Sequence, residues 1–206
     1  MEIGIIGAGH IGGTLARRLG ALGHSVLVAN SRGPESLEQL EREPGVTAGT
    51  IAQATDHDLV IISIPTRAVP ELPRDAFAGK IVVDTDNYYP QRDGRIAEID
   101  RGTPSSRWTA DHLTGARVVK AFNTINFRPL GEAGVPAGTP GRIAVPVAGD
   151  DAEATRVVSE LVEALGFDAV DGGTLDDSWR QEPGTPVYNA NLDAPAARAA
   201  IAEATR

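Results

Sequence analysis

"GIIGAGHIGG", residues 4–13, places Gly7, Gly9 and Gly12 in the spacing G-x-G-x-x-G. A short apolar run comes before the first glycine, and apolar residues then recur at helical spacing, at Ile11, Leu15, Leu19 and Leu22. This pattern predicts a strand, a tight turn and a helix, which is the context that makes the glycine spacing informative.

Each of the three glycines has a physical reason in a dinucleotide-binding turn. The first allows a sharp turn, the second lets the backbone approach a pyrophosphate, and the third lets the helix pack closely on the strand. The N-terminus of the helix would then direct unpaired N–H groups at the phosphates. A glycine-rich turn of an ordinary α/β protein is the alternative, but the flanking strand and helix favour nucleotide binding.

Length and net charge limit the number of domains and the kinds of partner that this chain can have. The 206 residues suit a single domain with a full hydrophobic core. Asp plus Glu number 28 and Lys plus Arg number 19, which gives a net charge of −9. An overall acidic field disfavours nucleic acids and anionic membranes as partners, so a basic residue that meets a phosphate must act locally.

Several other classes are excluded by residue types that are missing. No cysteine is present, which excludes disulfides and thiolate chemistry. His24, His57 and His112 have no ligand spacing, so no metal site is expected. The first residues do not resemble a secretory signal, and no apolar run has the length of a membrane helix. The sequence therefore predicts a cytoplasmic protein that is not a membrane protein.

Strand-like and helix-like stretches alternate along most of the chain. Strands are expected at residues 3–6, 26–29, 58–65, 80–84, 116–122, 141–150 and 167–170. Helices are expected after residue 10, from Pro34, over 151–166 and over 194–204, with a short helical or irregular link at 66–72. Such alternation predicts an α/β fold with a doubly wound parallel sheet of the Rossmann type. Pro146 suggests that its strand is an edge strand or contains a bulge.

Residues 1–206 are expected to form one dinucleotide-binding Rossmann domain, in which residues 172–206 make an extension of loop and terminal helix. In this extension Trp179, Arg180 and Tyr188 would suit a planar anionic partner. The favoured alternative is structural, with the aromatic rings anchoring the loop on the core or in a homodimer interface.

The end of the second expected strand indicates which dinucleotide is bound. In a Rossmann site this position lies beside the adenosine ribose, and a carboxylate there selects NAD. No Asp or Glu occurs between Gly12 and Glu35, and the strand ends in Ser31 and Arg32 instead. A hydroxyl and a guanidinium are donors suited to a 2′-phosphate, so we expect NADP(H). A surface arginine that only solvates a loop is the alternative.

With these residues in place, the chain resembles the NADPH-dependent F420 reductases, the NADP oxidoreductases that use a deazaflavin coenzyme. The resemblance is carried by "GIIGAGHIGGTLARRLGALGH" (4–24), "NSRGPESL" (30–37), "VIISIP" (60–65), "VVKAFNTI" (118–125), "VAGDD" (147–151) and "DGGTL" (171–175). The oxidoreductase domains of membrane ferric reductases look similar over the same region. The resemblance implies a single-domain enzyme that passes hydride between NADPH and coenzyme F420 or another flavin-like acceptor.

The resemblance also implies a set of cofactor-binding residues. They are Gly7, Ala8, Gly9, His10, Ile11, Gly12, Asn30, Ser31, Arg32, Ser63, Ile64, Pro65, Ala121 and Asn123. The glycine turn would hold the pyrophosphate, residues 31–32 the 2′-phosphate, residues 63–65 the adenine side and residues 121–123 the nicotinamide. Deazaflavin-using members carry His where this chain has Asn123, and the C-terminal section also differs, so the second substrate stays open.

No catalytic residue is assigned, because hydride transfer to a deazaflavin needs no dedicated acid. A carbonyl or imine acceptor would need a proton donor, and the candidates near strand ends are Lys120, Asp84, Asp86 and Tyr88. For Lys120 we favour pairing with an acid or reaching solvent, and for the two aspartates bracing of a turn. Asn123 would hydrogen-bond a nicotinamide carboxamide or a flavin carbonyl, or only its own turn.

Three functions remain compatible with these features. The first is an NADPH-dependent reductase with a deazaflavin or flavin partner. The second is a small-molecule dehydrogenase of the β-hydroxyacid type, although the segment after Gly172 is too short for the large helical domain of such enzymes. The third is a non-enzymatic NADP-binding module that senses redox state.

Overall fold

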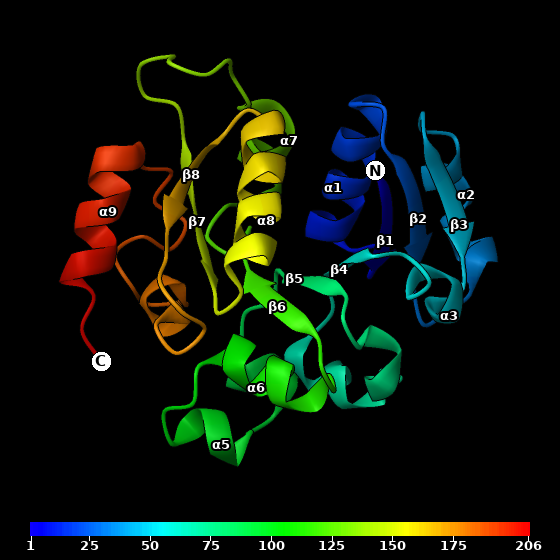
Figure 1. Ribbon diagram of the computed structural model, residues 1–206, viewed down its shortest axis with the longest axis horizontal. Helices are drawn as coiled ribbons and strands as arrows, with labels where there is room; N and C mark the ends of the chain where they lie inside the picture. Colours follow the sequence, from blue (N-terminus) through cyan, green and yellow to red (C-terminus); the bar gives the residue numbers. More distant parts are fainter.

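The computed structural model describes residues 1–206, which form one eight-stranded sheet with its flanking helices (Figure 1). Across the sheet the strand order is β3-β2-β1-β4-β5-β6-β7-β8. The strands are β1 Glu2–Ile6, β2 Ser25–Ala29, β3 Val46–Gly49, β4 Leu59–Ile62, β5 Ile81–Asp84, β6 Arg117–Lys120, β7 Ala144–Gly149 and β8 Asp168–Asp171.

Most of the helices are short, and two long ones flank the sheet. The α-helices are α1 His10–Ala21, α2 Glu38–Glu41, α3 Ile51–Ala54, α4 Pro90–Asp93, α5 Ala97–Asp100, α6 Ser105–His112, α7 Phe127–Glu132, α8 Ala152–Ala164 and α9 Ala194–Glu203. The 3₁₀ helices are η1 Pro34–Leu37, η2 Thr66–Glu71, η3 Arg74–Phe77 and η4 Ser178–Gln181. None of these helices combines the length and the apolar character that crossing a membrane requires.

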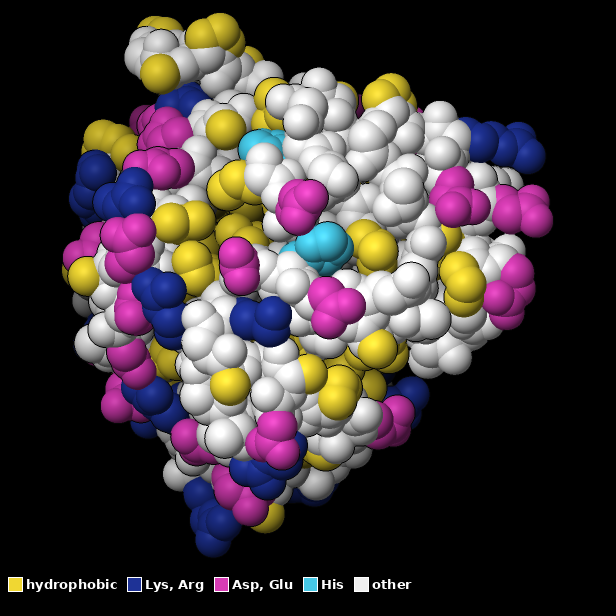
Figure 2. All heavy atoms as spheres, turned by 45° about the vertical axis from the view of Figure 1, so that its right-hand side comes forward, with side chains coloured by type: hydrophobic (Ala, Val, Ile, Leu, Met, Phe, Trp, Pro, Cys, Tyr) yellow, Lys and Arg dark blue, Asp and Glu magenta, His cyan; other side chains and the backbone are white.

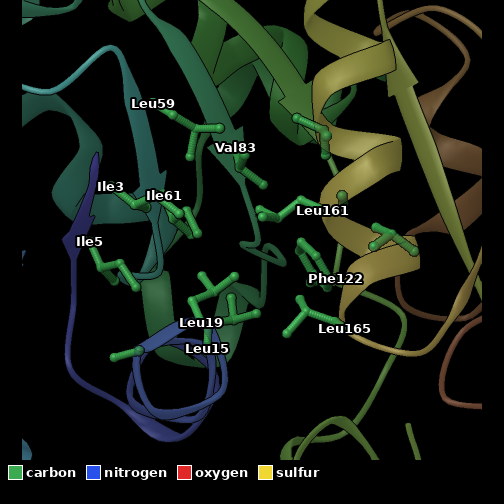
Figure 3. Packing of buried hydrophobic residues seen from close by; sticks show 14 of the residues in the cluster. Ile3, Ile5, Leu15, Leu19, Leu59, Ile61, Val83, Phe122, Leu161 and Leu165 are labelled. Carbon is green, nitrogen blue, oxygen red and sulfur yellow. The ribbon is translucent and has the colours of Figure 1, made fainter. Parts of the chain in front are cut away.

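The apolar strand residues alternate between two core layers, which is why both faces of the sheet are covered. Ile3, Ile5 and Ile61 pack with α1, α7 and α8 in the larger cluster, which Figure 3 shows from close by. Val60 and Ile62 point to the opposite face and pack with α3, α6, η2 and η3. Near-continuous apolar strands of this kind are typical of parallel sheets buried on both sides.

The first six strands are parallel and run in the order β3-β2-β1-β4-β5-β6. This arrangement confirms the predicted doubly wound Rossmann fold. The order reverses between β1 and β4, and in open α/β sheets the crevice beyond the carboxyl ends at such a point is where ligands bind.

The pairing of β7 departs from the expectation of a wholly parallel sheet. β7 runs antiparallel to β6 and pairs with it only through its last two residues, while it pairs in parallel with β8 over Ala144–Val147. β7 and β8 therefore project past the carboxyl end of β6. Pro146 is not on an edge strand or at a bulge, but no β6 residue pairs with it, so its missing N–H breaks no bond to that strand.

Several elements were not expected from the sequence: the edge strand β3, the short helices α3, α4, α5, α6 and α7, and the 3₁₀ helices η3 and η4. The predicted elements are present, most of them with shorter bounds, and residues 34–41 form a 3₁₀ turn followed by a one-turn helix rather than a single helix. Leu22, expected on the apolar face of α1, lies just past the helix end and is 46% exposed.

Candidate functional site

Three hollows meet at Gly9, which lines each of them. The central cavity, about 350 Å³, lies beyond the carboxyl ends of β4, β5 and β6. The β2-side hollow, about 400 Å³, lies beside the end of β2, and the α1-side hollow, about 370 Å³, lies between α1 and the η1–α2 segment. Together they follow the edge of the sheet on both sides of the glycine turn.

In the glycine turn, close packing requires two of the glycines, and the third faces open space. A Cβ at Gly7 would lie 2.0 Å from the Ser63 carbonyl oxygen, and Gly7 has a φ of +111° that disfavours other residues. A Cβ at Gly12 would lie 1.9 Å from the Gly7 carbonyl oxygen. A Cβ at Gly9 would meet nothing within 4 Å. Packing within the chain therefore does not require glycine here, and the missing side chain leaves space for a ligand.

Helix α1 begins directly after Gly9, and no side chain offsets the positive end of its dipole. Gly9 is the N-cap residue, no side chain caps the helix, and its first turn contains no acidic residue. The first backbone N–H groups of an α-helix have no intrahelical partner, and they attract anions. The turn is therefore suited to a phosphate group.

The β2-side hollow brings together the residues expected around the adenosine. It is lined by Gly7, Ala8, Gly9, Asn30, Ser31, Arg32, Ser63, Ile64 and Pro65, together with Ile6, Ile51, Ala68, Glu71 and Leu72. The Asn30 side chain shapes the turn, because its Oδ1 accepts the Arg32 N–H at 2.8 Å and its Nδ2 donates to Ser36 Oγ at 2.9 Å. The exposed Arg32 guanidinium has no hydrogen bond or ion pair and is free to bind a ligand.

The central cavity adds residues that the sequence did not single out. Its lining comprises Gly9, His10, Ile11, Ser63, Ile64, Pro65, Thr85, Asp86, Asn87, Tyr89, Arg92, Phe122, Asn123, Ile125, Asn126, Phe127, Tyr188 and Asn189. The His10 ring stacks on the Phe127 ring, with 4.3 Å between centroids and 17° between planes. Because Gly9, Ser63, Ile64 and Pro65 also line the β2-side hollow, the two spaces are continuous along one path.

Asn123 lines this cavity, but the hydrogen-bonding groups of its amide are engaged elsewhere. The Asn123 Nδ2 donates to Asn87 Oδ1 at 3.0 Å and to the Gln181 carbonyl at 2.7 Å, and its Oδ1 accepts from Gln181 Nε2 at 2.9 Å. The side chain therefore ties the end of β6 to the C-terminal extension. This structural role differs from both roles considered from the sequence, which were a ligand contact and a hydrogen bond within its own turn.

Phe122, next to Asn123, has strained backbone geometry. It is fully buried and has a φ of +62°, a left-handed conformation that is unusual for a bulky residue. Such strain persists only where the surrounding structure imposes it, and it concentrates at functional sites. Ala121, by contrast, is buried in the larger core and does not line the cavity.

A buried group of charged residues lies under the cavity floor. Asp84 Oδ1 accepts the Asp86 N–H at 2.9 Å, so this carboxylate braces the turn as expected. Lys120, fully buried, donates to the Asp86 carbonyl and to the Ser105 and Ser106 hydroxyls at 2.9–3.1 Å. The expectation that Lys120 pairs with an acid or reaches solvent is therefore wrong, because backbone and hydroxyl oxygens surround its ammonium group.

Asp86 is a titratable residue that lines the cavity and has a strongly altered environment. It is 6% exposed, and its Oδ2 is buried without a hydrogen-bond partner. Burial raises the pKa of Asp86 well above the ordinary range, and the adjacent Asp84 carboxylate raises it further, whereas Lys120 and Arg92 act in the opposite direction. The Asp86 carboxyl group is therefore stabilised in its neutral, protonated form.

The aromatic residues of the extension divide between the two roles proposed for them. Tyr188 lines the central cavity, where its hydroxyl contacts that of Tyr89. Trp179 does not line the cavity, and the guanidinium groups of Arg180 and Arg206 lie 4.6 and 4.8 Å from the centroid of its ring. Tyr88, a candidate proton donor, bonds Gly94, Ile96 and Asp100 outside the cavity.

Residues 2–88, which contain the glycine turn and the β2-side hollow, match the family model described as NADP oxidoreductase, coenzyme F420-dependent. The chain belongs to this family of NADP-dependent oxidoreductases. The structure of a hypothetical protein, SMa0349 from Sinorhizobium meliloti, is 35% identical, with 93% of this chain and 94% of that chain covered and a TM-score of 0.80.

Two further relatives carry functional names of their own. A candidate F420-dependent NADP-reductase from Arthrobacter sp. FB24 is 27% identical, with 86% of this chain and 87% of that chain covered and a TM-score of 0.73. Metalloreductase STEAP3 of Rattus norvegicus is 31% identical over 186 residues, which are 84% of this chain and 34% of that protein. The chain spans less than half the length of the curated relatives it matches.

The residues present fit the NADP(H) that the family name implies. Gly9 leaves open space at an uncapped helix N-terminus, and Arg32 offers a free guanidinium beside Ser31. Figure 2 shows acidic and basic side chains interspersed on one face of this oxidoreductase. The positive electrostatic potential that favours the phosphates is therefore confined to the residues around the glycine turn. No group of three or more His, Asp and Glu side chains is arranged to hold a metal ion.

The structure brings together most of the predicted binding residues of this family member, all except Gly12 and Ala121, which pack in the interior. Five lining residues were not predicted from the sequence, namely Asn87, Tyr89, Arg92, Asn126 and Phe127. The first three follow β5 and the last two follow β6, so the rule that ligands lie beyond the carboxyl ends of strands was the signal that could have found them.

Proposed function

We propose that the protein transfers hydride between NADP(H) and a flat, flavin-like acceptor, with the deazaflavin coenzyme F420 as the first candidate. The observation that carries the proposal is the central cavity, which continues directly from the glycine turn and is walled by the rings of Tyr89, Tyr188 and Phe127. Aromatic walls suit a planar ring system, because offset stacking adds to apolar burial. Family membership and the candidate F420-dependent NADP-reductase among its relatives support the same acceptor class.

Within this proposal the dinucleotide extends along the connected hollows. The pyrophosphate would lie against residues 7–12, and the 2′-phosphate against residues 30–32, where Arg32 lines both the β2-side and the α1-side hollow. Ser63, Ile64 and Pro65, which line both spaces, would position the middle of the ligand. The nicotinamide would enter the central cavity beside Asn123.

Bound NADPH would supply the hydride, and the chain's own residues would position the reacting partners. Hydride transfer requires reacting carbons about 3–3.5 Å apart and in line, and positioning alone contributes much of such catalysis. The stacked His10 and Phe127 rings and the tyrosine pair would limit the positions that two planar molecules can adopt. Asn123 would act indirectly, by holding residues 181–189 in place as the far wall.

The acceptor is tested by following the absorbance of NADPH with F420, FMN, FAD, ferric chelates and a panel of aldehydes, ketones and cyclic imines. Turnover with F420 or a flavin supports the proposal. Turnover with carbonyl or imine compounds alone would replace it by a small-molecule reductase. Tight NADPH binding without turnover on any acceptor would leave an NADP-binding module, the non-enzymatic alternative.

The choice of NADP(H) over NAD(H) is tested at Arg32. We expect Arg32→Ala to weaken NADPH binding about 10- to 150-fold, the range for one charge-assisted contact, and to leave NADH binding nearly unchanged. Titration calorimetry measures both affinities. Arg198→Ala is the matched control, because Arg198 is also exposed and unpaired but lies on α9. Equal losses for the two nucleotides would refute the assignment.

A second candidate function is reduction of a small carbonyl or imine, and one observation favours it. Asp86 places a carboxyl group with a raised pKa at the central cavity, where a developing oxyanion or amine would need a proton. We expect Asp86→Asn to abolish turnover of such substrates and to spare hydride transfer to F420 or flavins. Loss of both activities would show that Asp86 only maintains the cavity.

Two sequence predictions about the protein's setting stay predictions, namely a homodimer and a cytoplasmic location. Only Met1 and Leu22 are exposed among the large hydrophobic residues, so an interface between copies would need polar contacts as well. Light scattering on the eluting protein measures the mass directly, and a mass of one chain would rule out the homodimer.

A further inference from the structure

The α1-side hollow contains a second free cation that no assignment uses. It is lined by Ala8, Gly9, His10, Gly13, Arg17, Arg32, Ser36, Leu37, Gln39 and Leu40. Arg17 reaches it from α1 and Arg32 from the turn after β2, so two guanidinium groups on different elements face one space. This hollow shares Ala8, Gly9 and Arg32 with the β2-side hollow.

The Arg17 side chain extends back toward the N-terminus of its helix. Its two terminal nitrogen atoms lie 3.7 and 3.9 Å from the position that a Cβ at Gly13 would occupy. Helical side chains normally lean in this direction, and the missing side chain at Gly13 leaves the surface free for the guanidinium. The charge is thereby carried about one turn closer to the glycine turn than the Arg17 backbone.

No contact within the chain explains a cation at this position. Arg17 is exposed and makes no hydrogen bond or ion pair, whereas the adjacent Arg18 donates to three carbonyl groups. A positive group near the positive end of a helix is unfavourable, and α1 has no acidic residue in its first turn to offset it. In a chain with a net charge of −9, this local positive potential is the signature of an anion site.

We propose that Arg17 is a second arm of the 2′-phosphate site and helps to select NADP(H) over NAD(H). The inference rests on the proposed function, in which Arg32 binds that phosphate. A phosphate monoester carries a charge of about −1.5 to −2 near neutral pH, so Arg32 alone leaves part of it uncompensated. Arg17 supplies the second positive charge from the opposite element of the same hollow, while Asn30 and Ser36 maintain the shape of the turn.

The test uses nucleotide fragments, so that it is independent of any hydride transfer. Titration calorimetry gives the affinities of 2′,5′-ADP and of 5′-AMP, which lacks only the 2′-phosphate, for the wild type, Arg17→Gln, Arg32→Ala, the double variant and Arg198→Ala. Gln keeps much of the side chain and the helix propensity of Arg17 while removing the charge. We expect Arg17→Gln to weaken 2′,5′-ADP about 5- to 20-fold, the effect of one partly exposed charge-assisted contact. Binding of 5′-AMP should change by less than about twofold.

The outcomes separate this inference from the proposed function. If the wild type binds both fragments equally, the NADP assignment itself fails. If the wild type prefers 2′,5′-ADP and Arg32→Ala removes the preference while Arg17→Gln does not, only the role of Arg17 is overturned. Equal loss of both fragments in Arg17→Gln would place Arg17 at the pyrophosphate and also overturn the proposal. Arg17→Lys should retain most of the preference, since it keeps the charge.

Discussion

At the scale of single residues, Gly9 is expected to matter for ligand binding and not for the stability of the fold. Its backbone φ is −74°, which any residue adopts, and a Cβ there would contact no protein atom. We expect Gly9→Ala to lower stability by no more than about 1 kcal/mol, the cost of a poorer N-cap residue. NADPH affinity should fall about tenfold or more, because the methyl group would occupy the space shared by the three hollows.

Gly12→Ala is the matched comparison for that variant. Its methyl group would lie 1.9 Å from the Gly7 carbonyl oxygen, so α1 would have to move away from β1. We expect this variant to lose about 2 kcal/mol or more of its unfolding free energy, as overpacked cores do. Urea unfolding and NADPH titration of both variants give the comparison. A Gly9→Ala protein that loses stability while retaining affinity would contradict the ligand role of Gly9.

The Asp86 carboxyl group predicts a pH dependence of stability with a definite sign. Its pKa in the folded protein is raised above the ordinary value of 3.8, so the native state binds this proton more tightly than the unfolded chain does. Its stabilising contribution is complete below the unfolded pKa and is lost as the pH rises through the folded pKa. We therefore expect Asp86→Asn, which cannot ionise, to gain stability relative to the wild type as the pH rises above about 4.

Thermal unfolding of the two proteins across the pH range measures this difference. Asp111→Asn is the control, because it removes the same charge from an exposed position of α6. Stability curves of wild type and Asp86→Asn that stay parallel at all pH values would show that folding does not raise the pKa of Asp86.

At the scale of elements, the sequence predicted those that have a strong apolar pattern of their own. The strand before the glycine turn, β4 and helix α8 are examples, because their burial follows from periodicity alone. Helix α6 escaped prediction because its buried side is mainly Ser105, Ser106 and Thr109, whose hydroxyl groups are buried by tertiary contacts such as those with Lys120. Strand β3 is four residues at the sheet edge and lacks a two-sided apolar run.

Arg18 joins three helices that are distant in the sequence. It lies on α1 and donates from Nη1 to the Leu130 and Gly131 carbonyls of α7, at 2.9 and 3.0 Å, and from Nη2 to the Leu165 carbonyl at the end of α8, at 2.6 Å. The last carbonyl groups of a helix lack intrahelical partners and attract cations. This one side chain therefore satisfies the ends of two helices.

We expect Arg18→Met to lower the unfolding free energy by about 1.5–3 kcal/mol, the range for hydrogen bonds to a charged group. Arg17→Met is the neighbouring control, and an exposed residue without polar partners should change stability by less than about 0.5 kcal/mol. Both are measured by urea unfolding without nucleotide. Equal effects of the two substitutions would show that charge or helix propensity, rather than the carbonyl contacts, is responsible.

At the scale of the whole molecule, the two sides of the candidate site differ in how far the sequence reveals them. The nucleotide side was predictable because the glycine turn and the Ser31–Arg32 pair are local patterns within the first 88 residues, where the family model also matches. The far wall of the central cavity was predictable only in part: Tyr188 was named as suited to a planar partner, but its place in the wall beside Asn189 depends on long-range contacts such as Asn189 N–H to the Thr124 carbonyl at 2.9 Å. Such contacts leave no periodic signal.

The extension also contributes to the core, which bears on the prediction of one domain over residues 1–206. Val187, Ala197 and Ala200 pack with Ala144 and Val170 of β7 and β8 in a third apolar cluster. The end of the chain is therefore packed against the sheet through apolar side chains, as Figure 1 shows for α9 beside β7 and β8. A domain with such shared packing is expected to unfold in a single cooperative transition.

Gln181 tests whether the extension positions the acceptor. It is 1% exposed, does not line the cavity, and exchanges two hydrogen bonds with Asn123, so it acts through the wall rather than on the ligand. We expect Gln181→Ala to raise the KM for the acceptor while NADPH affinity changes by less than about twofold. The unfolding free energy should fall by about 1–3 kcal/mol, because the Asn123 Oδ1 loses its buried donor.

Gln91→Ala, at an exposed position of α4, is the control for that variant, and steady-state kinetics with NADPH and the acceptor varied in turn give the two constants. A selective change in the acceptor KM would separate the cavity into a nucleotide side built by β1–β4 and an acceptor side completed by the extension. If NADPH affinity fell in parallel, the Asn123–Gln181 contact would support the whole crevice. A displacement at the end of β6 would then be transmitted to the glycine turn through Phe127 and the His10 ring stacked on it.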